Sequence, residues 1–250
     1  MGQPAADRLL QWEQRQADEL LADVFGYHAV QLGWPPLDAL RANRMPHHWL
    51  AQPEFELGDP VQEGAHLQLD SRAWPWSADS LDLVVLPHAL ERSADPHACL
   101  REVARVLIPE GQVLITGLNP MSAWGWQQSR HERRQPTPSS ALIGYRRLRD
   151  WLRLLGFEVQ VSRFGGWTPA FGHERWMQRL SWMESVGQRW WPIFGGVYLI
   201  LATKRVSGVR LLEGRRWRTV RSPAPVSVPL VRSDPSSGRS TASKDLVESR

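Results

Sequence analysis

The sequence predicts an α/β fold with a mostly parallel sheet, and three consecutive segments carry this prediction. Residues 83–86 form a continuous apolar run that stops at Pro87, which is typical of a strand buried on both faces. Residues 96–107 repeat apolar side chains at helical spacing, and residues 112–117 form a second apolar run. A strand, an amphipathic helix and a second strand in this order predict a right-handed βαβ crossover.

The ends of the central helix are marked in the sequence. Ser93 and Asp95 are candidate N-caps, and Pro96 stands where the first helical residue is expected. Its buried face is formed by four apolar residues, Leu100, Val103, Ala104 and Leu107. The Pro-Glu-Gly sequence at 109–111 then predicts a turn before the next strand.

Further elements extend this unit in both directions. An apolar stripe predicts an N-terminal helix over about 7–24, and short strands are expected at 27–33 and 66–70. Downstream, the pattern predicts a helix over 145–157 closed by Gly156, a strand over 158–164 and a last strand over 196–205. The polar segment 127–140 is expected to be a surface loop.

Composition limits the architecture and the location. A chain of 250 residues with 42% hydrophobic content can bury one sizeable α/β core with at most a small cap. The sequence has no run of 18 apolar residues and no charged-then-apolar leader, which predicts neither a membrane span nor a signal peptide and favours a cytoplasmic location. The single cysteine, Cys99, excludes an internal disulfide and a cysteine-based metal cluster, and is expected to be a small core residue.

The charge is unevenly distributed along the chain. Residues 204–250 contain 11 Lys and Arg against 4 Asp and Glu, whereas residues 1–203 contain 19 against 22. From residue 206 onward the chain is rich in Arg, Ser and Pro and lacks periodicity, which predicts a basic, disordered tail over 206–250. A solubilising extension is the favoured interpretation, and contact with nucleic acid through phosphate neutralisation is the alternative.

Several motifs resemble those of a known enzyme superfamily. Residues 70–76, Asp-Ser-Arg-Ala-Trp-Pro-Trp, followed by Leu-Asp-Leu-Val-Val at 81–85, resemble the "D-x-x-x-L-P-F … F-D-L-V" run of class I S-adenosylmethionine-dependent methyltransferases. The sequences "HALE", "LREVARVLIPEG" and "VLITG" continue the resemblance to the type-11 group. "FGYHAVQLG", "GLNPMSAWGW" and "RDWLRLLGFEV" resemble an uncharacterised proteobacterial branch with a degenerate glycine-rich motif.

The resemblance implies a Rossmann-like fold with a mostly parallel seven-stranded sheet, helices on both faces and a disordered C-terminal tail. The implied methyltransferase-like domain covers residues 1–205. It would include the N-terminal helix, an insert over about 123–141 and an aromatic helical cover over about 167–195.

The resemblance also implies S-adenosyl-L-methionine as cofactor, bound at the carboxyl ends of the strands where the strand order reverses. Gly33 is the carried-over glycine of the turn after the first strand, and Gln31 stands where an acidic residue is usual. Glu54 corresponds to the ribose ligand, Asp70 with Ser71 to the adenine contact, and Leu86 is a further candidate contact. The chain departs from the family at Trp34-Pro35-Pro36, which replaces glycines and removes backbone donors.

Each candidate also has a structural interpretation. Glu54 lies among other acids and could equally be a solvated loop residue, and Asp70 could cap a turn. His88 follows a strand end and is a weak candidate for a general base, although opening the next helix is the favoured role. His47 and His48 lack metal-ligand spacing to other ligands, so no metal is expected.

Tryptophan is unusually frequent, with 14 residues in the chain. Six lie between Trp124 and Trp182, where this fold would cover its substrate, so they predict either an aromatic-lined pocket or helices packed on the sheet. The sequence therefore favours a cytoplasmic methyltransferase acting on a small or lipophilic molecule. The alternative is a non-catalytic methyltransferase-like protein that binds a macromolecular partner. Neither the substrate nor the oligomeric state follows from the sequence.

Overall fold

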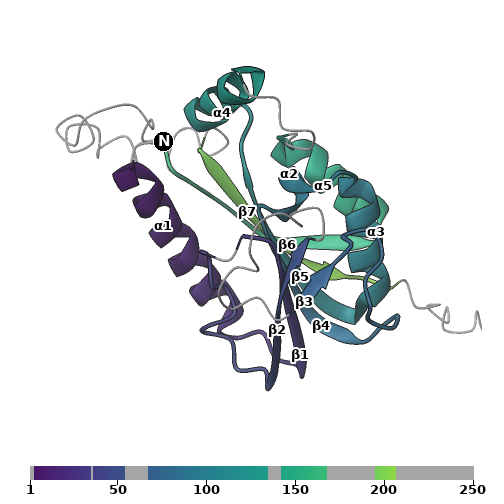
Figure 1. The fold of residues 1–250 in the computed structure, drawn as a ribbon. Helices are drawn as coiled ribbons and strands as arrows, with labels where there is room; N and C mark the ends of the chain where they lie inside the picture. The colour runs from purple at the N-terminus through teal and green to yellow at the C-terminus, as the bar shows by residue number, and fades with distance from the viewer. Residues whose placement is uncertain (1–2, 35, 54–66, 135–141, 168–194, 207–250) are drawn as a thin grey trace, which may run out of the picture. The chain divides into compact units, whose positions relative to one another are not determined.

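The computed structural model describes residues 3–34, 36–53, 67–134, 142–167 and 195–206 (Figure 1). The chain divides into two units, residues 1–208 and 209–250, and the described residues all belong to the first. The predicted basic tail therefore lies outside the described residues, apart from Val206. The same holds for most of the predicted aromatic cover.

A seven-stranded sheet forms the centre of the fold, in the order β3-β2-β1-β4-β5-β7-β6. The strands are β1 (His28–Leu32), β2 (His47–Pro53), β3 (Leu67–Leu69), β4 (Leu81–Pro87), β5 (Leu107–Leu118), β6 (Phe157–Gly165) and β7 (Val197–Lys204). The pairs from β3 to β5 are parallel, and β7 runs antiparallel to both of its neighbours. This arrangement confirms the prediction of a mostly parallel seven-stranded sheet.

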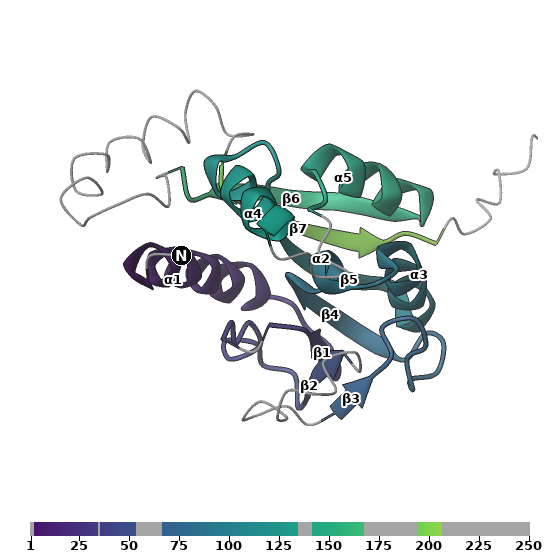
Figure 2. The same cartoon turned by 45° about the horizontal axis from the view of Figure 1, so that its top comes forward.

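Helices cover both faces of the sheet, as Figures 1 and 2 show. The helix α1 (Gln3–Leu21) lies on one face, and α3 (Pro96–Val106) and α5 (Tyr145–Leu154) lie on the other. On the α1 side, Ala17 and Leu21 pack against the buried strand residues Leu83, Val85 and Leu114. On the opposite side, a second apolar cluster includes Cys99, Leu100, Val103, Leu148 and Leu152. Cys99 is fully buried, as expected of a small core residue.

The connection from β1 to β2 contains no regular helix in the residues that are described. Leu37, Leu40 and Met45 of this connection pack into the α1-side core. Asn43 fixes its course, because the side-chain amide donates to the carbonyls of Leu21 and Val24 at 2.8 and 3.0 Å. A loop with a buried polar anchor therefore takes the place that a helix holds in a regular βαβ unit.

The central βαβ crossover forms as predicted, with one difference at its second strand. Asp95 caps α3, since its carboxylate accepts the Ala98 N–H at 2.9 Å, and Pro96 is the first helical residue. The predicted turn at 109–111 lies inside β5 as an irregularity. The pairing of β5 with β4 shifts between Leu81 and Leu83, and Glu110 has a φ of 66°. Leu107, predicted on the helix face, begins this strand.

Two other segments differ from the prediction. The strand β2 was not identified, because "HHWLAQP" alternates poorly and contains histidine and proline. The segment predicted as a loop at 127–140 is helical in its first part. The helix α4 spans Ala123–Arg134, and residues 135–141 lie outside the described set. A polar composition alone was misleading there, because helix formers such as Gln, Glu and Arg also occur in loops.

Candidate cofactor site

The strand order reverses between β1 and β4, which is where sheets of this kind bind their ligands. Gly33 begins the turn after β1 with a φ of 98°, a conformation that favours glycine. A Cβ atom at this position would lie 3.0 Å from the Ala89 Cβ and 3.1 Å from the Pro87 carbonyl oxygen. The backbone after β1 therefore packs directly against the backbone after β4, and only glycine fits this contact.

His88 is the first residue after β4 and precedes the short helix α2 (Ala89–Arg92). Its backbone is left-handed, with a φ of 51°, and its N–H donates to the Thr116 carbonyl at 3.2 Å. The imidazole lies between two carboxylates: Nε2 is 2.9 Å from Glu13 Oε1, and Nδ1 is 3.3 Å from Glu91 Oε2. Three separate elements, α1, the end of β4 and α2, therefore meet at one side chain.

The two carboxylates control the protonation of His88. Burial alone would lower its pKa, but the charges and hydrogen bonds of Glu13 and Glu91 outweigh burial and raise the pKa to about 10. The ring is therefore an imidazolium at neutral pH, with each N–H directed at a carboxylate. Both ring nitrogens face carboxylates, and a role of His88 as a general base stays a prediction.

Two buried oxygens near this ring have no hydrogen-bond partner. The Glu13 side chain is fully buried and its Oε2 atom is unpaired, and the same is true of Oγ1 of Thr116, a residue that is 1% exposed. Each belongs to a residue that is hydrogen-bonded to His88 through another atom. Buried acceptors without a donor are costly, so they fit a ligand that brings N–H or O–H groups. S-adenosylmethionine, the cofactor implied by the sequence, carries such groups.

Trp34 covers the same ring from the β1 side. Its ring centroid lies 5.0 Å from that of His88 at an interplanar angle of 86°, an edge-to-face contact. The indole is half-buried and packs against the α1-side core. A bulky side chain thus stands beside the strand ends where the family is expected to have small residues.

The side chains of Gln31 and Leu86 pack within the fold, and a contact of either residue with a cofactor stays a prediction. The Gln31 amide is buried: its Nε2 donates to the Leu37 carbonyl at 2.5 Å, and its Oε1 accepts the Ala39 N–H at 3.0 Å. Both ends of the amide therefore support the loop after β1. Leu86 is fully buried in β4, within the α3-side core. Its side chain contributes to the core.

Asp70 lies at the end of β3 and caps a turn. Its carboxylate accepts the Arg72 backbone N–H at 2.8 Å and pairs with the Arg72 guanidinium at 3.0 Å. The hydrogen bonds from Arg72 lower the pKa of Asp70. Ser71 is buried, with its hydroxyl 3.2 Å from the Ser93 hydroxyl. Glu54 lies outside the described residues. A contact of Asp70 with a cofactor stays a prediction.

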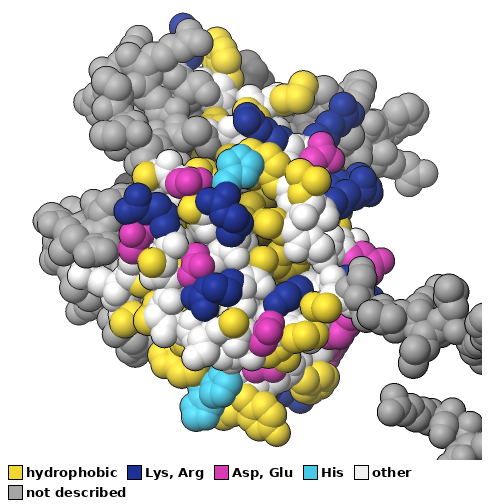
Figure 3. All heavy atoms as spheres, turned by 90° about the vertical axis from the view of Figure 1, so that its right-hand side faces the viewer, with side chains coloured by type: hydrophobic (Ala, Val, Ile, Leu, Met, Phe, Trp, Pro, Cys, Tyr) yellow, Lys and Arg dark blue, Asp and Glu magenta, His cyan; other side chains and the backbone are white. Residues whose placement is uncertain are grey.

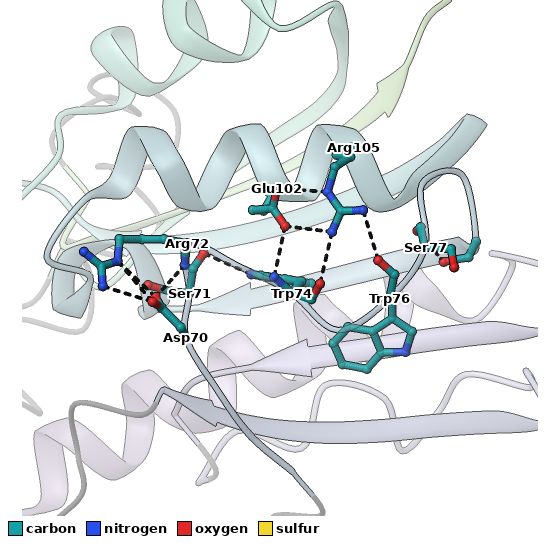
Figure 4. A network of polar contacts seen from close by, with 9 residues as sticks. Asp70, Ser71, Arg72, Trp74, Trp76, Ser77, Glu102 and Arg105 are labelled. Atoms are coloured by element: carbon teal, nitrogen blue, oxygen red, sulfur yellow. Dashed lines mark hydrogen bonds and ion pairs between the residues drawn. The ribbon is translucent and has the colours of Figure 1, made fainter.

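The segment after Asp70 is tied to α3 by hydrogen bonds with Glu102 and Arg105, two helix residues that pair with each other (Figure 4). Glu102 accepts the Trp74 N–H at 2.9 Å and pairs with Arg105 at 2.7 Å. Arg105 in turn donates to the carbonyls of Trp76 and Trp74 at 3.0 and 3.1 Å. The residues that follow the third strand are therefore held in place from the helix side.

A cavity of about 450 Å³ lies between α1 and the end of β6. Its walls are Trp12, Gln16, Glu19, Ser162, Arg163, Phe164 and Trp167. Arg163 is held by Glu19 at 2.7 Å and by Gln16 at 2.7 Å. Gly165 makes room for the Trp12 indole, which a larger side chain there would overlap. Because Gly165 pairs with Val197 and Val197 with Leu118, the cavity opens at the same edge of the sheet as the end of β5.

Sequence reasoning missed Glu13 and Thr116. Glu13 belongs to the polar run "QWEQRQ" on α1, and no motif distinguishes it from its neighbours. A buried charge on an otherwise solvated helix is visible only when its partner is known, and His88 lies 75 residues away. Thr116 is an ordinary β-branched strand residue in the sequence.

The described residues contain no group of three or more His, Cys, Asp or Glu side chains arranged to hold a metal ion. None of the helices in the described part of the chain is long and apolar enough to cross a membrane.

Comparison with known proteins agrees with this geometry. Residues 51–115 match the model of a methyltransferase domain family, Methyltransf_11. The uncharacterized protein YafS of Escherichia coli K12 is 33% identical over 154 residues, which are 60% of this chain and 61% of that protein. The chain thus matches under two thirds of that relative's length.

Solved structures with the same fold include two bacterial enzymes. One is a SAM-dependent methyltransferase of Thermotoga maritima described as a possible histamine N-methyltransferase, with a TM-score of 0.56 and 16% identity over 77% of this chain and 87% of that chain. The other, an S-adenosylmethionine-dependent methyltransferase of Mesorhizobium loti, has a TM-score of 0.51 and 14% identity over 76% of this chain and 96% of that chain.

These identities are low, so the solved structures establish the fold, and the family match covers the segment from β2 to β5 that builds the strand ends. Residues 51–115 are thus similar to the methyltransferase domain family, and the described residues have the fold of the solved S-adenosylmethionine-dependent methyltransferases.

Proposed function

We propose that the protein is an S-adenosylmethionine-dependent methyltransferase that acts on a small or lipophilic molecule. The observation that carries this proposal is the buried, partly unpaired acidic group at the reversal point of the sheet. The acidic residues are Glu13 and Glu91, which lie around the ring of His88 together with the hydroxyl-bearing Thr116. Such a group at this place fits a ligand that is cationic and rich in donors.

When bound, S-adenosylmethionine supplies a methyl group activated by a positively charged sulfur. The chain's own residues would bind and orient it: Gly33 lets the turn after β1 approach the site, and Asp70 and Ser71 stand at the end of β3 for the adenine side. The residues around the site would hold an acceptor in line with that methyl group. Positioning alone can supply much of the required rate.

The cavity between α1 and β6 supports an acceptor with a flat apolar part. Trp12, Phe164 and Trp167 contribute aromatic surface, and Arg163 with Glu19 contributes a charged rim. Trp12 lines the cavity, and its neighbour in α1, Glu13, belongs to the His88 group. This placement would bring an acceptor close to the reversal point.

One observation favours the second candidate, a non-catalytic methyltransferase-like protein that binds a macromolecular partner. Trp34 packs against His88, and the two prolines that follow it have no amide hydrogen to offer a ligand. Two missing donors at about 1 kcal/mol each would weaken binding by roughly thirtyfold relative to a regular glycine-rich turn.

Calorimetric titration with S-adenosylmethionine and with S-adenosylhomocysteine separates the two candidates. We expect dissociation constants of about tens of micromolar or higher for the proposed methyltransferase, because of those missing donors. Transfer of a labelled methyl group from the cofactor to a small-molecule extract would then demonstrate activity. Absence of binding at millimolar ligand would contradict the methyltransferase and leave the binding protein.

A further inference from the structure

The unpaired oxygens beside His88 define what a ligand at this place must bring. Glu13 Oε2 and Thr116 Oγ1 are both buried, and each lacks a donor, whereas Glu13 Oε1 is already bonded to His88 Nε2 at 2.9 Å. A carboxylate oxygen accepts hydrogen bonds only, so the absent group must be a donor. The hydroxyl of Thr116 can accept from the same group.

The charges of this cluster determine whether the donor group should be neutral or positively charged. Two acidic side chains, Glu13 and Glu91, face the single imidazolium of His88, which can compensate the charge of only one of them. The remaining negative charge lies away from water, where a neutral donor leaves it uncompensated. Glu91 has no free oxygen, because Oε1 accepts the Leu118 N–H and Oε2 faces His88. The uncompensated charge is therefore available at Glu13.

We propose that Glu13 and Thr116 form the subsite that binds the α-ammonium group of the methionine part of the cofactor. This inference rests on the proposed function. An ammonium group has three N–H donors and a positive charge, so it satisfies both oxygens and the residual charge together. The sulfonium group is charged but has no N–H, and the adenine amino and ribose hydroxyl groups are donors without charge.

Glu13 is held in place before any ligand binds. Its helix is anchored by Ala17 and Leu21 in the core and by the pair between Glu19 and Arg163 at 2.7 Å. Its own Oε1 is fixed by His88, so the carboxylate has little freedom to rotate. A carboxylate that another residue already holds in place loses less conformational entropy when a ligand binds.

Access to the subsite requires a side chain to move, because both oxygens are buried. Trp34 is the candidate: its indole is half-buried and lies edge-on against His88 at a centroid distance of 5.0 Å. A rotation of this indole would free one edge of the ring that holds Glu13, at the loss of one aromatic contact.

Calorimetric titration of the full chain with three ligands tests the subsite. S-adenosylmethionine has the ammonium and the sulfonium, S-adenosylhomocysteine has only the ammonium, and 5′-methylthioadenosine has neither. We expect Glu13→Gln to weaken the first two ligands equally, by about ten- to a hundredfold, and to leave 5′-methylthioadenosine within about twofold. The control, Asp7→Asn, removes an exposed carboxylate from the same helix and should leave all three affinities within about twofold.

Other outcomes would overturn the inference. Equal weakening of all three ligands by Glu13→Gln would mean that Glu13 acts through the fold, and weakening of S-adenosylmethionine alone would place the sulfonium there. If Glu13→Gln does not fold, Thr116→Val replaces the hydroxyl by a methyl group of similar shape. It should weaken the two amino-acid-bearing ligands about three- to tenfold, and an unchanged affinity would contradict the subsite. If the wild-type protein binds none of the ligands, the proposed function itself fails.

Discussion

The Nε2 atom of His88 lies 2.9 Å from the Oε1 atom of Glu13, so the helix α1 is bonded to the residue that follows the central strand of the sheet. The contact joins positions 75 residues apart and is shielded from water on both sides, since Glu13 is fully buried and the His88 side chain is 12% exposed. Three predictions concern this site and its surroundings, and a fourth concerns residues 206–250.

Replacement of His88 should change both the stability and its dependence on pH. The folded pKa of about 10 lies above the ordinary value of 6.5, so the charged ring stabilises the fold fully below pH 6.5. That contribution is lost as the pH rises toward 10. Tyr198 contributes little below pH 9.5, because the ordinary pKa of its phenol, 10.0, lies above this range, and burial and the charge of Glu91 raise the folded value further.

The measurement is chemical denaturation at pH 6.5, 8 and 9.5. The wild-type free energy of unfolding should fall over this range, and His88→Gln should lose most of that slope. At pH 6.5 the variant should be less stable by about 3–5 kcal/mol, because Glu13 and Glu91 are left without a buried counter-charge. Parallel pH profiles for the two proteins would contradict a charged His88.

Removal of the Trp34 indole should strengthen cofactor binding. If the indole must leave His88 before a ligand enters, Trp34→Ala removes a contact worth about 0.5–1.5 kcal/mol, which corresponds to a gain of about two- to tenfold. The readout is the S-adenosylhomocysteine dissociation constant. Trp126→Ala is the matched control, since that indole is 54% exposed on α4. A weaker complex for Trp34→Ala would mean that the indole is part of the binding surface.

The role of Asp70 can be separated into capping and ligand binding. Asp70→Asn keeps an acceptor for the Arg72 N–H and removes the charge, whereas Asp70→Ala removes both. If Asp70 contacts the cofactor, Asp70→Ala should reduce the affinity by about ten- to a hundredfold in a folded protein. A change in thermal midpoint with unaltered affinity would restrict Asp70 to the turn. Circular dichroism melts measure the thermal midpoint of both variants, and calorimetry measures their affinity for the cofactor.

Deletion of residues 206–250 should leave the fold intact. The sequence of this segment lacks the apolar periodicity that packing requires, and the last described strand ends at Lys204. We expect a thermal midpoint within a few degrees of the full chain. The truncation should stop after Arg205, whose N–H donates to the Gly156 carbonyl and whose guanidinium pairs with Glu158. Loss of soluble expression would show that the segment contributes to the core.

The sequence predicted the regular parts of this fold because they follow local rules. The apolar run before Pro87, the cap at Asp95 and the stop at Gly156 each depend on neighbouring residues only, and the structure confirms them. The strand β2 was missed because its burial comes from its place between β1 and β3, and its composition does not show this. The helix α4 was missed because its polar residues read equally well as a loop.

The site was less predictable than the fold. Its carboxylate comes from α1, and whether a glutamate on an amphipathic helix faces water or His88 depends on packing across the whole sheet. Gln31 was assigned by its position beside Gly33, but its side chain points into the connection from β1 to β2 and supports that loop. A motif position fixes the backbone of a residue better than the direction of its side chain.

Because β7 lies between β5 and β6, the sheet can form completely only after β7 has been synthesised. The strand β6 leaves the ribosome before β7 and has no neighbouring strand until residues 197–204 have been made. The helix α1 precedes these strands in the sequence, yet Arg163, which bonds Glu19, comes 144 residues after Glu19. A nascent chain that ends before β7 would therefore expose the edge of β5 and leave α1 without its β6 contact. The growing polypeptide is vulnerable to aggregation until β7 is translated.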